Sequence, residues 1–128
     1  MKANEIFALA RSFLGEKAAA YSNTAFVPNW LNLLLAESLP YENSVRRAEG
    51  REELKAAPQI TSLEEDIDYT DAITKAALPY GLAFFFHNED GEKYQAQLMR
   101  NAYISGLRSA ACAFEETIED VYGGDADE

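Results

Sequence analysis

The sequence predicts an all-α fold: a small bundle of about four helices, with a long irregular loop between helices 2 and 3 and a long C-terminal helix. Apolar residues recur at the three- and four-residue spacing of amphipathic helices in four parts of the chain. Runs that alternate apolar and polar residues, which would indicate half-buried strands, are weak throughout. The length of 128 residues and the hydrophobic fraction of 48% favour one helical domain over residues 1–122. A disordered acidic tail is expected at residues 123–128.

The first two helices are predicted from caps and apolar periodicity. Asn4 is a suitable N-cap and Gly15 is a stop signal, so the first helix is expected from about residue 4 to residue 15. The second is expected from near Ala25 to just before Pro40, with Pro28 in its first turn. Apolar residues surround most of this second helix, which predicts burial on more than one side.

Residues 40–69 form the least regular segment. Pro40 and Pro58 interrupt helices, although residues 46–55 could still form a short solvated helix. The run Ser62-Leu63-Glu64-Glu65 matches a capping box, so a single turn is expected after Ser62. Because an irregular loop of roughly thirty residues is generally functional or disordered, this segment is the first indication of a binding role.

Two more helices complete the predicted bundle. A third is expected from a cap at Thr70 or Asp71 to about His87, with a kink at Pro79. A turn is expected at residues 88–91, followed by a last helix over about 92–121. Thirty helical residues would span about 45 Å, so part of this helix is expected to project toward a partner.

The charge of the chain is strongly acidic. It has 22 Asp and Glu residues, 11 Lys and Arg residues and a net charge of −11. Because tight binding to nucleic acid requires Lys and Arg to neutralise phosphates, it is not expected here. An acidic wall would instead let DNA pass without adhering, and the alternative is that the charge only keeps the protein soluble.

Cysteine content and hydropathy bear on the cellular setting. Cys112 is the only cysteine and cannot form an intramolecular disulfide, which favours a reducing, cytosolic setting. The apolar runs fall short of the roughly 20 residues that a membrane span requires. The N-terminus shows an early acidic residue instead of a signal pattern. We therefore expect a soluble protein without membrane association.

Catalytic, cofactor and metal sites are not predicted. His87 is the only histidine and is expected to cap the end of its helix. Cys112 has acidic neighbours, whereas a nucleophilic thiol needs a base or a positive setting. The acidic cluster at residues 64–68 lacks the central glycine of a calcium loop, and the chain contains no glycine-rich phosphate loop. We therefore expect no enzyme activity.

Two groups of residues could contact a partner. The only concentration of basic residues comprises Arg46, Arg47, Arg51 and Lys55. This run could dock an acidic partner, but glutamates interrupt it, so the alternative is a salt-bridged surface segment. Trp30 and residues 84–86, three phenylalanines, belong either to the core or to an interface that a neighbouring subunit covers.

Two motifs in the middle of the chain resemble a known pattern. Residues 60–69 read ITSLEEDIDY, and residues 77–83 read ALPYGLA. An Asp- and Asn-rich turn and a long last helix with Tyr94 and Tyr103 follow. This arrangement is similar to the small head–tail connector, or head-completion adaptor, proteins of tailed phages and prophages. The likeness covers roughly residues 4–110.

The resemblance implies a structural, non-catalytic adaptor without cofactors. Such adaptors form a ring, commonly twelvefold, under the portal protein, meet tail-completion proteins and continue the DNA exit channel. The implied location is the host bacterial cytoplasm during assembly, and then the virion. The irregular segment would embrace a neighbouring subunit, and the last helix would dock on the portal or line the channel. The resulting candidate interface residues are Arg46, Arg47, Arg51, Tyr69, Tyr80 and Phe85.

A second hypothesis comes from the charge alone. A small acidic helical adaptor or regulatory protein, acting as a monomer or dimer, could bind a basic protein partner through its acidic C-terminus. Seven acidic residues and no basic residue follow Arg108.

Overall fold

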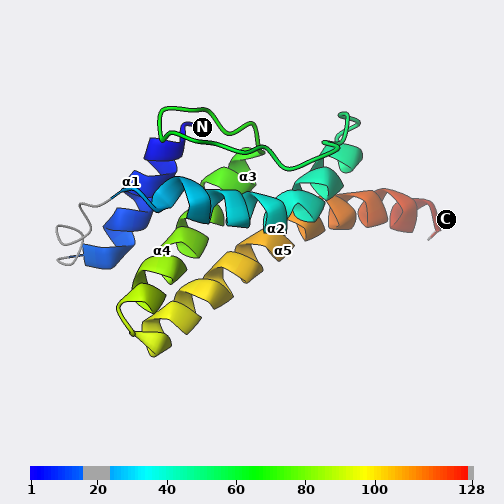
Figure 1. Ribbon diagram of the computed structural model, residues 1–128. Coiled ribbons are helices and arrows are strands. Elements are labelled where there is room, and N and C mark those ends of the chain that lie inside the picture. Colours follow the sequence, from blue (N-terminus) through cyan, green and yellow to red (C-terminus); the bar gives the residue numbers. More distant parts are fainter. Residues whose placement is uncertain (16–23, 127–128) are drawn as a thin grey trace.

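The computed structural model describes residues 1–15 and 24–126, with side chains described as far as Ala111 (Figure 1). It confirms the all-α prediction, with four longer helices, one short helix and a loop between α2 and α3. The described residues form no strand, and their single β-bridge joins Lys2 to Asp66. None of the described helices is long and apolar enough to cross a membrane. The helices are α1 (Ala3–Leu14), α2 (Val27–Ala48), α3 (Asp71–Thr74), α4 (Leu78–Glu89) and α5 (Lys93–Ala126).

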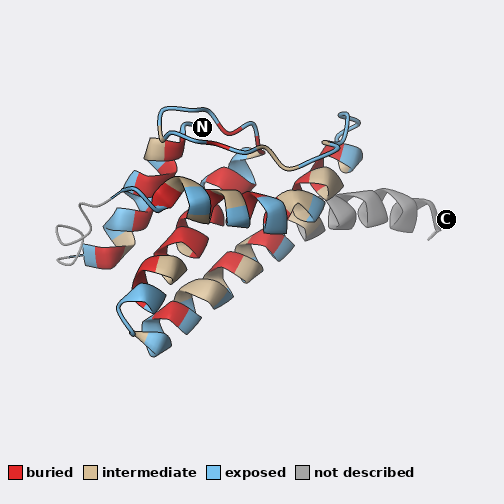
Figure 2. Ribbon diagram, in the orientation of Figure 1, coloured by how far each residue is buried: buried red, intermediate tan, exposed pale blue. Residues whose placement is uncertain are grey.

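The helices pack around one apolar core. Helices α4 and α5 form an antiparallel hairpin, α1 packs beside α4, and α2 crosses both members of the hairpin (Figure 1). Figure 2 shows buried residues along the sides of the helices that face one another. The largest fully buried side chains include Ile6, Leu31, Leu34, Leu35, Leu78, Leu82, Tyr103 and Leu107.

Helix α2 differs most from its predicted form, because Pro40 lies inside it and α2 continues to Ala48. A proline inside a helix costs about 3 kcal/mol, since it removes one hydrogen bond and crowds the preceding turn. Buried side chains lie on both sides of Pro40, among them Leu35 and Val45. Burial of several such side chains, at roughly 1.5–3 kcal/mol each, outweighs the cost of the proline.

The predicted third helix is divided in two, and the predicted kink at Pro79 is wrong. Helix α3 ends at Thr74, and α4 begins at Leu78, so Pro79 lies in the first turn of α4. A proline is tolerated there because its missing N–H would have no partner within the helix. The turn after α4 forms as predicted, and Gly91 adopts a φ of 73° in it.

The ends of α1 and α5 also refine the predictions. Lys2, and not Asn4, occupies the N-cap position of α1. The backbone N–H groups of Ala3 and Asn4 instead donate to carbonyls of the α2–α3 loop, Glu65 O and Leu63 O, each at 2.9 Å. Helix α5 continues through Ala126, past the expected end near residue 121. Residues 127–128 of the predicted tail lie outside the described residues.

Candidate protein-binding surface

The α2–α3 loop, residues 49–70, is anchored to its own helix along its length. The side-chain amide of Asn32 donates to Ile60 O at 2.9 Å and accepts from Ile60 N at 2.8 Å. Asn43 pairs with both backbone groups of Leu54 at the same two distances. The loop therefore runs back along α2 with two of its residues bonded as they would be to a neighbouring strand (Figure 1).

A buried ion pair holds both ends of this loop. Glu42 is fully buried, and its carboxylate accepts from Arg46 Nε at 2.7 Å and from Thr70 N at 2.7 Å. Arg46, 8% exposed, also donates to the backbone oxygens of Glu52 at 3.3 Å and Asp68 at 2.7 Å. Hydrogen bonding to Glu42 raises the pKa of Arg46 above its usual value. Each of the three guanidinium nitrogens of Arg46 therefore donates a hydrogen bond within the chain.

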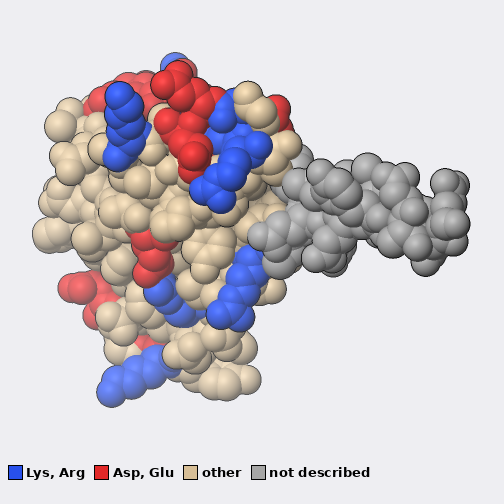
Figure 3. Space-filling view, turned by 90° about the vertical axis from the view of Figure 1, so that its right-hand side faces the viewer, with Lys and Arg blue, Asp and Glu red and all other residues tan. Residues whose placement is uncertain are grey.

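The two other arginines proposed as interface residues also have partners within the chain. Arg47 pairs with Glu53 at 2.8 Å, and Arg51 pairs with Glu49 at 3.3 Å and donates to Thr70 Oγ1 at 2.9 Å. Acidic and basic side chains lie next to one another along the upper edge of the molecule in Figure 3. This is the arrangement of a salt-bridged surface segment. The short helix considered for residues 46–55 is wrong, because α2 ends at Ala48 and the loop follows.

The predicted turn after Ser62 is present in the loop. The Glu65 carboxylate accepts from the backbone N–H groups of Thr61 at 2.7 Å and Ser62 at 2.8 Å. Glu65 N in turn donates to Ser62 O at 3.3 Å. These hydrogen bonds lower the pKa of the Glu65 carboxyl group, with the bond from Thr61 N contributing most.

The two tyrosines proposed as interface residues pack within the domain. Tyr69 is buried, and its hydroxyl donates to Leu35 O at 2.7 Å. Burial raises the pKa of Tyr69 from 10.0 to about 12. Tyr80 is half-buried and stacks on Phe13 with ring centroids 4.4 Å apart. Tyr69 is thus inaccessible to a partner in this structure, whereas Tyr80 keeps part of its surface exposed.

Phe85, the last of the proposed interface residues, belongs to a partly exposed aromatic surface. Phe85 is half-buried and stacks on Trp30 with centroids 5.4 Å apart. Trp30 stacks in turn on Phe26 at 6.1 Å, and Phe84 lies 5.2 Å from Phe85. Leu33 is one turn further along α2 on the same side as Phe26 and Trp30. We call these five residues the aromatic surface.

Exposure singles out two members of the aromatic surface. Phe26 is 57% exposed and Leu33 is 59% exposed, although both are large apolar side chains. The core of α2 lies on another side of the helix, at Leu31, Leu34 and Leu35. The sequence did carry this signal, because apolar residues surround α2, but it did not show which side remained open.

An ion pair borders the aromatic surface. The Arg100 guanidinium donates to both Glu37 carboxylate oxygens, at 2.7 and 2.6 Å, and lies 5.7 Å from the Phe84 ring centroid. Hydrogen bonding between the two side chains lowers the pKa of Glu37 and raises that of Arg100. The pair joins α2 to α5 at the edge of the exposed apolar area.

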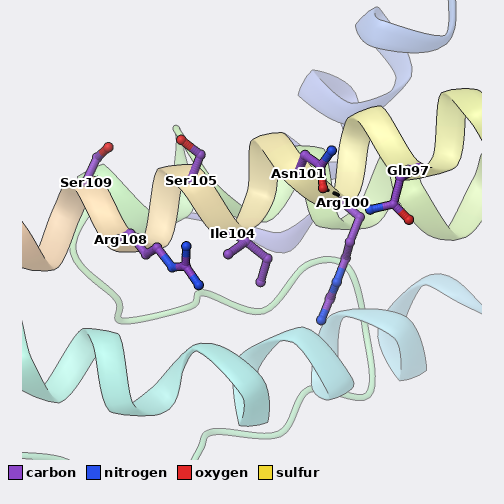
Figure 4. Close-up of a pocket in the computed structure, with 7 residues that line it drawn as sticks. All are labelled: Gln97, Arg100, Asn101, Ile104, Ser105, Arg108 and Ser109. Carbon is purple, nitrogen blue, oxygen red and sulfur yellow. Dashed lines mark hydrogen bonds between the residues drawn. The ribbon is translucent and has the colours of Figure 1, made fainter.

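Beyond Arg100, an open groove of about 620 Å³ follows α5 (Figure 4). Arg100, Ile104 and Arg108 point toward α2, and Gln97 donates to Asn101 at 2.9 Å (Figure 4). Arg108 forms neither a hydrogen bond nor an ion pair with another described residue. The α5 groove is lined by Gln97, Arg100, Asn101, Ile104, Ser105, Arg108 and Ser109.

The structure describes the side chain of one of the two residues considered for chemistry. His87 lies buried in the last turn of α4, and its Nδ1 is 3.4 Å from Glu92 Oε1. The side chain of Cys112 lies outside the described residues. Residues 1–15 and 24–111 contain no group of three His, Cys, Asp or Glu side chains that could hold a metal ion.

Comparisons with known proteins complete the description of the chain. No protein-family profile, no curated protein and no solved structure matches it.

Proposed function

We propose that this chain is a structural, non-enzymatic head–tail connector of a tailed phage or prophage. In this role it forms a ring under the portal protein, binds tail-completion proteins and continues the DNA exit channel. The resemblance of residues 60–69 and 77–83 to such adaptors is the basis of the specific assignment. The helical fold with a long last helix is consistent with it.

The observation that carries a role in assembly is the aromatic surface. Phe26 and Leu33 are more than half exposed, and Trp30 and Phe85 offer stacked, partly exposed rings beside them. Aromatic side chains dominate the binding energy of many protein interfaces, particularly where less buried residues surround them. A contiguous apolar area on regular helices is therefore better explained by a protein partner than by the needs of the monomer.

The α2–α3 loop has a different role in this proposal from the one expected at first. The bond from buried Arg46 of α2 to Asp68 O, and the paired loop residues Ile60 and Leu54, hold it to its own subunit. Releasing it to embrace a neighbour would remove the loop acceptors of buried Arg46, at Glu52 O and Asp68 O, and the Thr70 N–H that donates to buried Glu42. We therefore assign contact with a neighbouring protein to the aromatic surface and not to the loop.

Electron microscopy of the chain with its cognate portal protein tests the proposal. Purified chain is mixed with portal rings, and the added ring is scored in negative-stain class averages. We expect Leu33→Asp to abolish the added ring, because a desolvated carboxylate opposes burial in an apolar contact. Leu9→Asp is the matched control, since Leu9 is an apolar residue of α1 that is 36% exposed and does not belong to the aromatic surface.

Two results would contradict the proposal. Wild-type chain that fails to associate with portal rings would remove the connector assignment. Capture of a basic protein in its place would support the acidic adaptor hypothesis. If Leu33→Asp and Leu9→Asp form the added ring equally well, the aromatic surface is not the contact.

A further inference from the structure

We infer that the α5 groove binds the acidic C-terminal segment, residues 115–128, of a second copy of this chain. The inference rests on the proposed ring, for which it names one contact between neighbours. The groove adjoins the aromatic surface at Arg100, whose guanidinium lies over Phe84. The two features therefore form one continuous surface on α2, α4 and α5.

The chemistry of the groove suits a carboxylate. Arg108 provides a guanidinium, and Ser105 and Ser109 also line the groove, although their hydroxyl groups point away from α2 in Figure 4. Guanidinium and hydroxyl donors are the usual partners of carboxylate oxygens in proteins. The other cation of the groove, Arg100, is occupied by both oxygens of Glu37. Arg108 is thus the groove's available cation among the described residues.

The sequence of α5 offers Arg108 no carboxylate at helical spacing. The residues three and four positions away are Ser105 and Ile104 on one side, and Ala111 and Cys112 on the other. The nearest acidic residue after it is Glu115, seven positions further along the chain. The groove therefore holds an exposed cation with no carboxylate at helical spacing, so a carboxylate partner would come from another segment or another molecule.

The acidic segment, residues 115–128, lacks basic residues that could pair with its carboxylates. It contains seven acidic residues and no basic one, and its like charges recur four residues apart, at Glu115 and Glu119 and at Glu116 and Asp120. Like charges at this spacing destabilise an isolated helix by a few tenths of a kcal/mol per pair. A cationic surface on another molecule would relieve this repulsion.

The groove and the segment that would fill it belong to different copies of the chain. Because α5 continues as one helix from Lys93 to Ala126, Glu116 lies about 12 Å beyond Arg108 along the axis and cannot turn back. The helical length after Ala111 is about 22 Å, against about 18 Å for the groove from Gln97 to Ser109. A head-to-tail contact of this kind repeats from copy to copy, and it forms a ring when the rotation between copies closes on itself.

A nucleic acid is the other polyanion that a cation could attract, but the chain as a whole disfavours it. The net charge of −11 repels a phosphate backbone, and one available arginine in the groove releases few counterions. A single acidic segment of known length needs fewer cations than a duplex does. The observations therefore favour the carboxylates of a second copy.

Charge reversal in trans tests the inference with the full-length chain. The groove variant carries Arg108→Glu, and the tail variant carries Glu115→Lys, Glu116→Lys, Glu119→Lys and Asp120→Lys. Each variant alone places like charges at the contact, and we expect its self-association to weaken at least tenfold. In a one-to-one mixture each groove can receive a tail of opposite sign, so association should return to within about twofold of wild type.

Native mass spectrometry and sedimentation equilibrium, with and without portal rings, measure this association. Lys93→Glu is the matched control, because it makes the same charge change at an exposed position at the start of α5, outside the groove. A mass tag on one variant shows whether the two alternate in the mixed assembly. Circular dichroism of each variant confirms that the helices are retained.

The outcomes separate the inference from the proposed function. If wild type forms rings on the portal and Arg108→Glu behaves like Lys93→Glu, the inference is overturned and the connector assignment stands. If the mixture fails to recover while both variants remain folded, the inference is likewise overturned. If wild type neither self-associates nor binds portal rings, both proposals fail. Loss of DNA binding in Arg108→Glu, with unchanged self-association, would assign the groove to nucleic acid and overturn the inference.

Discussion

The α2–α3 loop and the aromatic surface lie on different sides of α2. The irregular loop was expected to contact a partner, but it is the side chains on the helices that remain exposed. The loop has no regular structure, yet Asn32, Asn43 and Arg46 bond its backbone to α2. The aromatic surface lies on α2, on its N-cap residue Phe26 and on α4, yet Phe26 and Leu33 remain open to solvent. A segment without regular secondary structure can therefore have its polar groups bonded within the domain, while a regular helix exposes apolar side chains that a partner can contact.

The two regions differ in which groups need a partner: backbone hydrogen-bonding groups in the loop, and apolar side chains on the helix. A loop without helix or strand partners has many backbone donors and acceptors, which must be paired where they are buried. In this molecule side-chain amides and a buried ion pair form hydrogen bonds with the loop backbone. A helix pairs its own backbone, so only its side chains remain to be covered, and on α2 the apolar ones exceed what the core buries.

The largest expected effect comes from breaking the buried ion pair of the loop. Glu42→Ala leaves the Arg46 guanidinium buried without its carboxylate and leaves Thr70 N without an acceptor. We expect the free energy of unfolding to fall by about 3–5 kcal/mol, measured by urea denaturation. Glu53→Ala removes the partner of exposed Arg47 and should leave the denaturation midpoint unchanged. Equal effects of the two substitutions would refute the special role of the buried pair.

A smaller effect is expected from removing one amide anchor of the loop. Asn32→Ala removes the acceptor of Ile60 N and the donor to Ile60 O, and Ile60 is itself buried. The expected loss of stability is about 2 kcal/mol. Native-state hydrogen exchange should show the amide of Ile60 losing protection while that of Leu82 in α4 keeps it. Protection that survives at Ile60 would mean that the loop is held by its apolar contacts alone.

The buried Tyr69 hydroxyl links the stability of the loop to alkaline pH. Burial raises the pKa of Tyr69 from 10.0 to about 12, so the folded state retains this proton where the unfolded state has lost it. The stabilisation is complete below pH 10 and is lost as the pH rises through about 12. Urea midpoints between pH 9 and 12 should therefore fall less steeply in Tyr69→Phe than in wild type. Parallel curves for the two proteins would contradict this.

The smallest effect on stability is expected on the aromatic surface. Leu33→Ser replaces an apolar side chain that is 59% exposed, so the free energy of unfolding should change by less than about 0.5 kcal/mol. Leu35→Ser on the buried side of the same helix is the comparison, and it should cost several times more, because Leu35 is fully buried. Similar urea midpoints for the two variants would mean that Leu33 supports the fold and is not kept for a partner.

Much of the fold could be predicted from the sequence because the relevant signals are local. Apolar periodicity located all four longer helices, and the turn before α5 followed from its Asp and Gly residues. The interruption of α2 at Pro40 was wrong because burial on both sides of the proline, set by distant helices, outweighs the local penalty. The start of α1 was misassigned for a similar reason, since its cap comes from the loop.

The candidate site was predicted less well than the fold. Arg46 and Tyr69 were chosen because charged and aromatic residues in an irregular segment suggest contact with a partner, but both are buried within the domain. Phe85 lies in a partly exposed aromatic group, and its exposed neighbours Phe26 and Leu33 were missed. Their periodicity is the same as that of core residues, and only the packing of α2 against α4 and α5 shows which of its apolar sides is covered.

The capping of α1 by loop carbonyls has a consequence for how this helix begins. A side-chain cap closes a ring of about three residues, whereas the bonds from Ala3 to Glu65 and from Asn4 to Leu63 close loops of roughly sixty. By polymer statistics this closure costs roughly 3 kcal/mol more in chain entropy than a local cap. The first turn of α1 therefore does not form independently. It becomes ordered together with the middle of the chain, as one cooperative unit.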